Sequence, residues 1–127
     1  MESSPKTAFT SRKVGDVVVF DVEGEFSRTA SPVPTLHDLV KAQLDKGARK
    51  VLFNFEKTGF VDSFGVGQII GTYTSTQNLG GRFKLAAISP RLLALLIITR
   101  LVPDILQVHP NEEAAMESFA EPPAPGA

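Results

Sequence analysis

The sequence predicts a single α/β domain in which about four helices cover a mixed or parallel sheet of four to five strands. Runs of β-branched and apolar residues, each of strand length, alternate along the chain with segments whose apolar residues recur at helical spacing. The first two predicted strands are adjacent and favour an antiparallel hairpin, whereas helices separate the later strands, as in parallel sheets. A length of 127 residues suits one domain with a sizeable core.

The first elements are a hairpin and a helix. Strands are predicted at about 7–13 and 16–23, joined by a turn at Gly15. A helix is predicted at about 34–46, and Gly47 follows its last turn, where a C-terminal glycine belongs. The apolar residues of this helix recur at helical spacing: Leu36, Leu39, Val40 and Leu44.

The centre of the chain contains a buried strand, a loop and a second helix. The strand is predicted at 50–56 and the loop at 56–62, after which a helix begins near Ser63 and ends before Gly80. One apolar stripe of this helix is expected to face the core: Val66, Ile69, Ile70 and Tyr73.

The last part repeats the strand and helix alternation. A strand is predicted at 82–88, and Ser89 is expected to cap a helix at 90–99 that begins with proline. A short strand at about 105–108 and an asparagine-capped helix at about 111–119 complete the domain. The domain is therefore predicted at 7–120, with a flexible N-terminus at 1–6 and a disordered Pro/Ala/Gly tail at 121–127.

Composition and charge exclude several classes of function. A formal charge of −1 gives no reason to expect nucleic acid or a membrane surface as partner. Without cysteine there is no disulfide or thiolate ligand, and His37 and His109 lack ligand-type neighbours, so no metal or cofactor is predicted. The start of the chain has no signal-peptide pattern and no apolar run approaches the roughly 20 residues of a membrane span, which favours a cytoplasmic protein.

One stretch is locally cationic. No Asp or Glu occurs between Ser63 and Pro103, where four basic residues lie: Arg82, Lys84, Arg91 and Arg100. These residues are either scattered surface bases or a region that favours an acidic partner or a phosphate.

The segment around Ser63 has the composition of a functional site but not of a catalytic one. A serine nucleophile elbow needs Gly-x-Ser-x-Gly, and Val61 stands where the first glycine belongs. The available bases, His37 and His109, lie in a helix and beside a proline. A dinucleotide-binding pattern also fails, because three glycines miss its spacing by one residue: Gly65, Gly67 and Gly71. No catalytic residue is predicted.

With a catalytic site and a dinucleotide site rejected, the remaining feature of this segment is the hydroxyl of Ser63 at the start of a helix. In the structural interpretation, Asp62 or Ser63 caps the helix and the glycines let it approach the sheet. In the functional interpretation, phosphorylation of Ser63 adds roughly −1.5 to −2 charges at the helix N-terminus and controls the binding of a partner.

The stretch "VLFNFEKTGFVDSFGVGQII" resembles the STAS domains of bacterial anti-sigma factor antagonists, with an apolar strand followed by Asp-Ser at a helix start. The elements from "NLGGRFKLAAISPRLL" onward continue the resemblance, which covers roughly residues 8–120. It implies a non-enzymatic module that binds an anti-sigma kinase, is phosphorylated by that kinase with ATP, and is restored by a serine phosphatase. Ser63 occupies the phosphoacceptor position. The implied partner-binding residues are Asp62, Phe64, Gly65, Gly67 and Gln68.

Three departures from the family pattern stand out. Phe64 replaces a second small hydroxyl, and its ring either anchors a partner or turns inward. Asn54 replaces a frequent aspartate at the end of the buried strand. The turn Glu25-Phe26-Ser27 replaces an acidic Glu-Leu-Asp turn, which changes the expected partner surface there.

The helix at 90–99 is apolar all round. Because a helix on a sheet buries one face, some of its leucines and isoleucines should stay exposed unless another surface covers them. A homodimer or partner contact is favoured here over deep burial of the helix. This feature also suits an alternative function, a STAS scaffold that is never phosphorylated. A second alternative is a sensor for a small ligand, such as a nucleotide or lipid.

Overall fold

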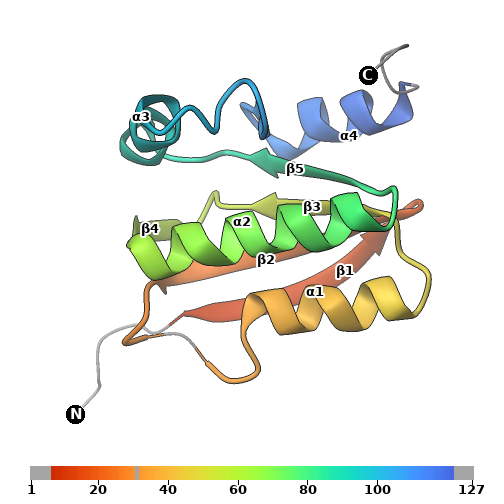
Figure 1. Cartoon of the computed structure of the whole chain (residues 1–127), viewed down its shortest axis with the longest axis horizontal. Helices are drawn as coiled ribbons and strands as arrows, with labels where there is room; N and C mark the ends of the chain where they lie inside the picture. Colours follow the sequence, from red (N-terminus) through yellow and green to blue (C-terminus); the bar gives the residue numbers. More distant parts are fainter. Residues whose placement is uncertain (1–6, 31, 122–127) are drawn as a thin grey trace.

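The computed structural model describes residues 7–30 and 32–121, which form a mixed six-stranded sheet with four helices (Figure 1). This confirms the predicted fold class, with one strand more than the four to five expected. The predicted flexible N-terminus, 1–6, and the predicted tail apart from Glu121 lie outside the described residues.

The strand order in the sheet is β1-β2-β3-β5-β6, and β4 pairs separately with β2. β1 pairs antiparallel with β2 through a turn at Gly15, whose φ is +62°, and every other pair is parallel. The carboxyl ends of β3 and β5 therefore meet at one edge of the sheet. The strands are β1 (Ala8–Val14), β2 (Val17–Phe26), β3 (Lys50–Asn54), β4 (Thr58–Val61), β5 (Arg82–Ala86) and β6 (Gln107–His109).

The strand β4 was expected to be part of a loop. It pairs with the end of β2 at Gly24 and Phe26, so β2 also continues beyond the predicted end at residue 23. Thr58 fixes this pairing, because its hydroxyl donates a hydrogen bond of 2.6 Å to the carbonyl of Val22. The pairing places the start of the following helix beside the end of β2.

The helices are α1 (Leu36–Asp45), α2 (Ser63–Asn78), α3 (Pro90–Ile98) and α4 (Glu112–Ala120). α1 and α2 lie side by side on one face of the sheet, and α4 covers the other face (Figure 1). The first face buries an aromatic cluster in which Phe53 contacts Phe20, Phe55 and Phe83. The opposite face is smaller and packs Phe119 of α4 against the sheet.

Helix α2 buries most of the predicted stripe, since Ile69 is fully buried and Val66 and Tyr73 pack against the core. Its fully buried residues lie on one helical face and are mostly small: Gly65, Ile69, Thr72 and Thr76. Ile70 is 40% exposed, so its assignment to the core was wrong. Small side chains let α2 lie close to the sheet, while α1 covers its flank with His37 against Gly71.

Side-chain caps start all four helices. The predicted caps are confirmed, since Ser89 accepts a hydrogen bond from the N–H of Leu92 and Asn111 accepts one from Ala114. Gly47 follows α1 with a φ of +105°, which only glycine adopts readily.

Candidate functional site

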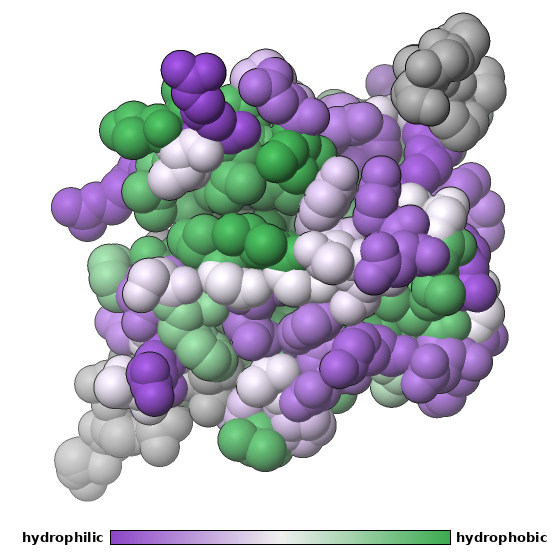
Figure 2. Space-filling view, viewed as in Figure 1, coloured by the Kyte–Doolittle hydropathy of each residue, from purple (hydrophilic) through white to green (hydrophobic). Residues whose placement is uncertain are grey.

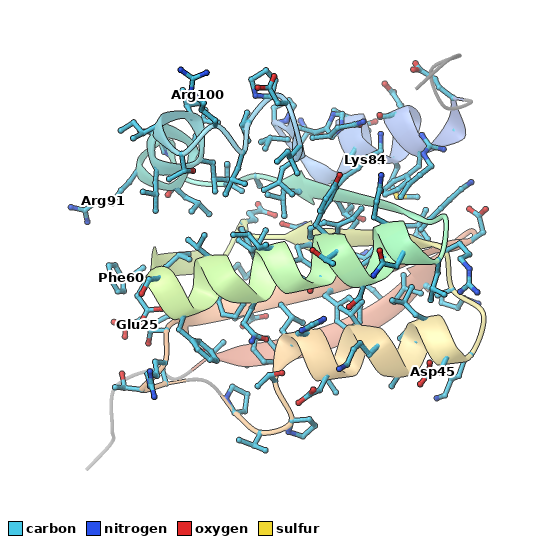
Figure 3. The ribbon with its side chains drawn as sticks, viewed as in Figure 1. Glu25, Asp45, Phe60, Lys84, Arg91 and Arg100 are labelled. Carbon is cyan, nitrogen blue, oxygen red and sulfur yellow. The ribbon has the colours of Figure 1, made fainter. Side chains whose placement is uncertain are left out.

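The candidate site is the junction between β4 and α2. Ser63 is the first residue of α2 and its side chain is exposed. Figure 3 shows Phe60, Glu25 and Arg91 at this same end of the molecule. Phe60, three residues before Ser63, is 49% exposed, so an exposed aromatic side chain lies on the strand that leads into the predicted phosphoacceptor.

Asp62 connects three segments at this junction and is the cap of α2. One carboxylate oxygen accepts from the N–H of Gly65 at 3.0 Å, and the other accepts from the N–H of Arg28 at 3.0 Å. The backbone N–H of Asp62 donates to the carbonyl of Phe26 at 3.3 Å. Of the two residues predicted as possible caps, Asp62 therefore performs this role.

The Asp62 carboxylate is stabilised in its charged form. Partial burial raises its pKa, but the backbone N–H groups of Arg28, Gly65 and Phe64 together outweigh burial and leave the pKa below its usual value. Asp62 is thus negative at neutral pH. A phosphate on Ser63 would stand next to this charge.

The two glycines of the motif occupy different environments. A Cβ on Gly65 would lie 2.5 Å from the carbonyl oxygen of Phe26 and 2.8 Å from a methyl group of Val61. A Cβ on Gly67 would meet no atom within 4 Å. Both lie within α2 rather than in a turn, so close approach to β2 explains Gly65, while Gly67 leaves a low surface beside Ser63.

The other two predicted partner-binding residues are partly engaged within the domain. Gln68 accepts a hydrogen bond of 2.9 Å from the backbone N–H of His37 and so connects α2 to the start of α1. Phe64 is half-buried, so its side chain is neither fully exposed to a partner nor fully turned into the core.

Neither histidine is placed as a base for Ser63. The Nε2 atom of His37 lies 2.8 Å from the hydroxyl of Ser75, on the side of α2 that faces α1. His109 lies at the end of β6, and burial is the main cause that lowers the pKa of each imidazole. The described residues contain no group of three His, Asp or Glu placed to share a metal ion.

A polar network at the start of α4 was not predicted from the sequence. Arg12 donates to Asp21 at 2.7 Å and to Glu112 at 2.9 Å, and Asn54 donates to Glu112 at 3.0 Å. Asn54, one of the three departures from the family pattern, thus holds a carboxylate that an aspartate would repel. Only the long-range fold brings these residues together.

The network lines a cavity of about 520 Å³. Five acidic residues and two basic ones border it: Asp21, Glu23, Glu56, Glu112, Glu113, Arg12 and Lys57. This excess of negative charge disfavours a nucleotide phosphate as its ligand.

No helix in the described part of the chain has the length and hydropathy of a membrane span.

The comparisons with known proteins agree with this geometry. A family model of the STAS domain matches residues 8–115. The anti-sigma factor antagonist SpoIIAA in its unphosphorylated form is 25% identical, with a TM-score of 0.71 over 91% of this chain and 100% of that one. The phosphorylated form of SpoIIAA, a Bacillus cell fate determinant, is 27% identical, with a TM-score of 0.71 over 88% of this chain and 99% of that one.

A third structure supports the fold alone. An anti-sigma factor antagonist from Mycobacterium paratuberculosis is 18% identical, with a TM-score of 0.79 over 94% of this chain and 100% of that one. The family match spans most of the chain, including the β4–α2 junction, and these structural relatives have its α/β fold. The chain therefore belongs to the STAS domain family.

Proposed function

We propose that this chain is a cytoplasmic anti-sigma factor antagonist that binds an anti-sigma kinase while Ser63 is unphosphorylated. The observation that carries the proposal is the exposed hydroxyl of Ser63 on the first residue of α2, beside the capping carboxylate of Asp62. The existence of SpoIIAA in unphosphorylated and phosphorylated forms supports it. In this function the chain is a binding module and not an enzyme.

The proposed cycle uses a single covalent change. The bound kinase transfers the γ-phosphoryl group of ATP to the Ser63 oxygen, which loses its proton, and ADP leaves. A serine phosphatase later hydrolyses the ester and restores the hydroxyl. Because Asp62 already holds α2 in its capped form, the added charge acts mainly on whatever protein is docked over the junction.

The docking surface in this proposal combines apolar contact with a flat backbone. Phe60 and Phe64 offer aromatic surface, Gly67 keeps the first turn of α2 low, and Gln68 borders the same turn. A phosphate of roughly −1.5 to −2 charges, in addition to Asp62, makes this surface strongly negative and expels a partner whose matching surface was apolar.

Intact mass spectrometry tests the site of modification. The wild-type chain is incubated with ATP and the anti-sigma kinase encoded nearest to its gene, and it should gain one phosphate. Ser63→Ala should gain none, while Ser11→Ala, which removes an exposed hydroxyl from β1, should behave as wild type. Phosphate on the Ser63→Ala chain would contradict the assignment.

The scaffold alternative has one observation in its favour, the exposed apolar surface of α3, where a homodimer was expected. Sedimentation across a wide concentration range distinguishes it. A scaffold assembles and keeps its assembled mass when Ser63 is replaced by Ala or Asp. For the proposed antagonist, Ser63→Asp should weaken binding to the kinase while Ser63→Ala keeps it.

A further inference from the structure

The outer side of α3 exposes an unusual amount of apolar surface. Among the exposed large apolar residues of the described chain, four lie within an eleven-residue window: Leu95, Ile97, Ile98 and Ile105. Ile98 is 77% exposed, whereas Leu92 and Leu96 are buried on the inner side. Figure 2 shows apolar surface gathered over α3. We call this surface, together with the arginines at its two ends, the α3 patch: Arg91, Leu95, Ile97, Ile98, Arg100 and Ile105.

An apolar cavity adjoins the α3 patch. It has a volume of about 540 Å³ and is lined by Leu93, Val102, Leu106 and neighbouring residues, none of them acidic. Leu93 lies one helical turn before Ile97 on the same side of α3, which places the cavity beside Ile97 at the edge of the α3 patch. It is large enough to receive an apolar side chain of another molecule.

The charge of the α3 patch is positive at both ends. Figure 3 shows Arg91 and Arg100 pointing outward from α3. Neither arginine forms an ion pair with another residue in the described ranges. The one carboxylate in the adjoining loop is Asp104.

Arg100 ends α3 in a Schellman motif, in which its own N–H donates to the carbonyl of Ile97 and the N–H of Leu101 donates to that of Leu96. The φ of Arg100 is +64°, the left-handed conformation that follows many helices and favours glycine. An arginine here costs stability, and its side chain forms no ion pair among the described residues that offsets this cost.

From these observations we infer that the α3 patch binds an acidic amphipathic helix of a partner protein. An apolar side chain of that helix fills the cavity, and carboxylates near its two ends pair with Arg91 and Arg100. Arg91 lies at the start of α3 and Arg100 just beyond its end, so the carboxylates are placed near the two ends of the partner helix.

Charge favours this occupant over two others. A second copy of the chain, related by a two-fold axis, would bring arginines of the two α3 patches together without compensating acids. A lipid bilayer is disfavoured because the patch offers only two bases, Arg91 and Arg100, whereas segments that bind anionic membranes typically carry about four to eight. The inference goes beyond the Ser63 switch and does not depend on it.

Two synthetic 14-residue peptides with the same leucine stripe test the inference. One has Glu at two positions nine residues apart, and the other has Lys there. By titration calorimetry at low salt, the Glu peptide should bind the full chain at least tenfold more tightly, and the difference should narrow as salt is added. Equal binding of both peptides, or binding of neither, would overturn the inference.

Variants separate binding from folding. Arg100→Gly should weaken binding of the Glu peptide about threefold. It should also raise the melting temperature of the chain, because glycine adopts the left-handed backbone conformation at a lower cost than arginine. Ile98→Ser should weaken binding of the Glu peptide about tenfold. Leu79→Ser, at another exposed apolar site after α2, and Ser63→Asp should leave this binding unchanged. Self-association that Ile98→Ser abolishes, or tighter binding to vesicles of anionic lipid than to the Glu peptide, would also overturn the inference.

Discussion

At the scale of single residues, Asp62 has a structural role separate from any role in binding. Its two oxygens accept backbone hydrogen bonds from Arg28 and Gly65. Asp62 therefore fixes both the segment that follows β2 and the start of α2. Ser63 can therefore change its chemical state without losing the helix cap.

We predict that Asp62→Ala lowers the free energy of unfolding by about 1 to 2 kcal/mol, the usual cost of a lost cap. Ser63→Ala should change it by less than about 0.5 kcal/mol, as expected for a surface substitution. Urea denaturation of the two variants measures both values. Equal stability of Asp62→Ala and wild type would show that the cap contributes nothing.

Alanine substitutions at Gly65 and Gly67 should change the stability of the domain in opposite directions. Gly65→Ala should destabilise the domain by about 1 to 3 kcal/mol, because its methyl group would lie 2.5 Å from the Phe26 carbonyl oxygen. Gly67→Ala should stabilise α2 by about 0.5 to 1 kcal/mol, since its methyl group meets no atom within 4 Å. Urea midpoints that shift in the same direction would contradict this account.

At the scale of elements, α4 is held to the sheet at both ends. Glu112 contacts Arg12 and Asn54 at its start, while Arg82 donates to the carbonyls of Ser118 and Phe119 at its end. Hydrogen bonds from Arg12 are the main cause that holds the pKa of Glu112 below its usual value of 4.5; burial opposes them and Asn54 adds to them.

The stability of Glu112→Gln should therefore depend on pH. At pH 7 the variant should be less stable than wild type by about 1 kcal/mol, the upper range for a partly exposed ion pair. A lowered pKa means that this contribution is present above pH 4.5 and is lost as the pH falls through the folded-state value. Unfolding curves of both proteins from pH 7 to pH 3 measure the difference in their free energies of unfolding. A difference that stays constant over this range would contradict a stabilising charge on Glu112.

Sequence periodicity predicted the helices better than the strands and helix faces. The caps at Ser89 and Asn111 depend on local residues and were predicted correctly. β4 was missed because its four residues include an exposed glycine and phenylalanine, and because the pairing of Thr58 and Val61 with Gly24 and Phe26 is long-range. Within α2, Ile69 was predicted correctly, whereas Ile70 is exposed and the small residues Gly65, Thr72 and Thr76 are buried in the positions beside Ile69.

At the scale of the whole molecule, topology brings the candidate site and the α3 patch to one end. α2 and α3 each begin after strands whose carboxyl ends lie at the same edge of the sheet, with Phe60 and Arg91 beside that edge (Figure 3). The position of Ser63 at a helix start could be predicted from the sequence. The bonds from Arg28 to Asp62 and from His37 to Gln68 could not, because they join residues more than 30 positions apart.

The affinity of the anti-sigma kinase for the two states of Ser63 tests the central proposal most directly. Titration calorimetry would compare the unmodified chain with a chain that carries phosphoserine at position 63, and Ser11→Asp would control for an added charge on β1. We predict that the phosphorylated chain binds at least tenfold more weakly, about 1.4 kcal/mol, while Ser11→Asp binds as wild type. Equal affinity of the unmodified and phosphorylated chains would contradict the proposed switch.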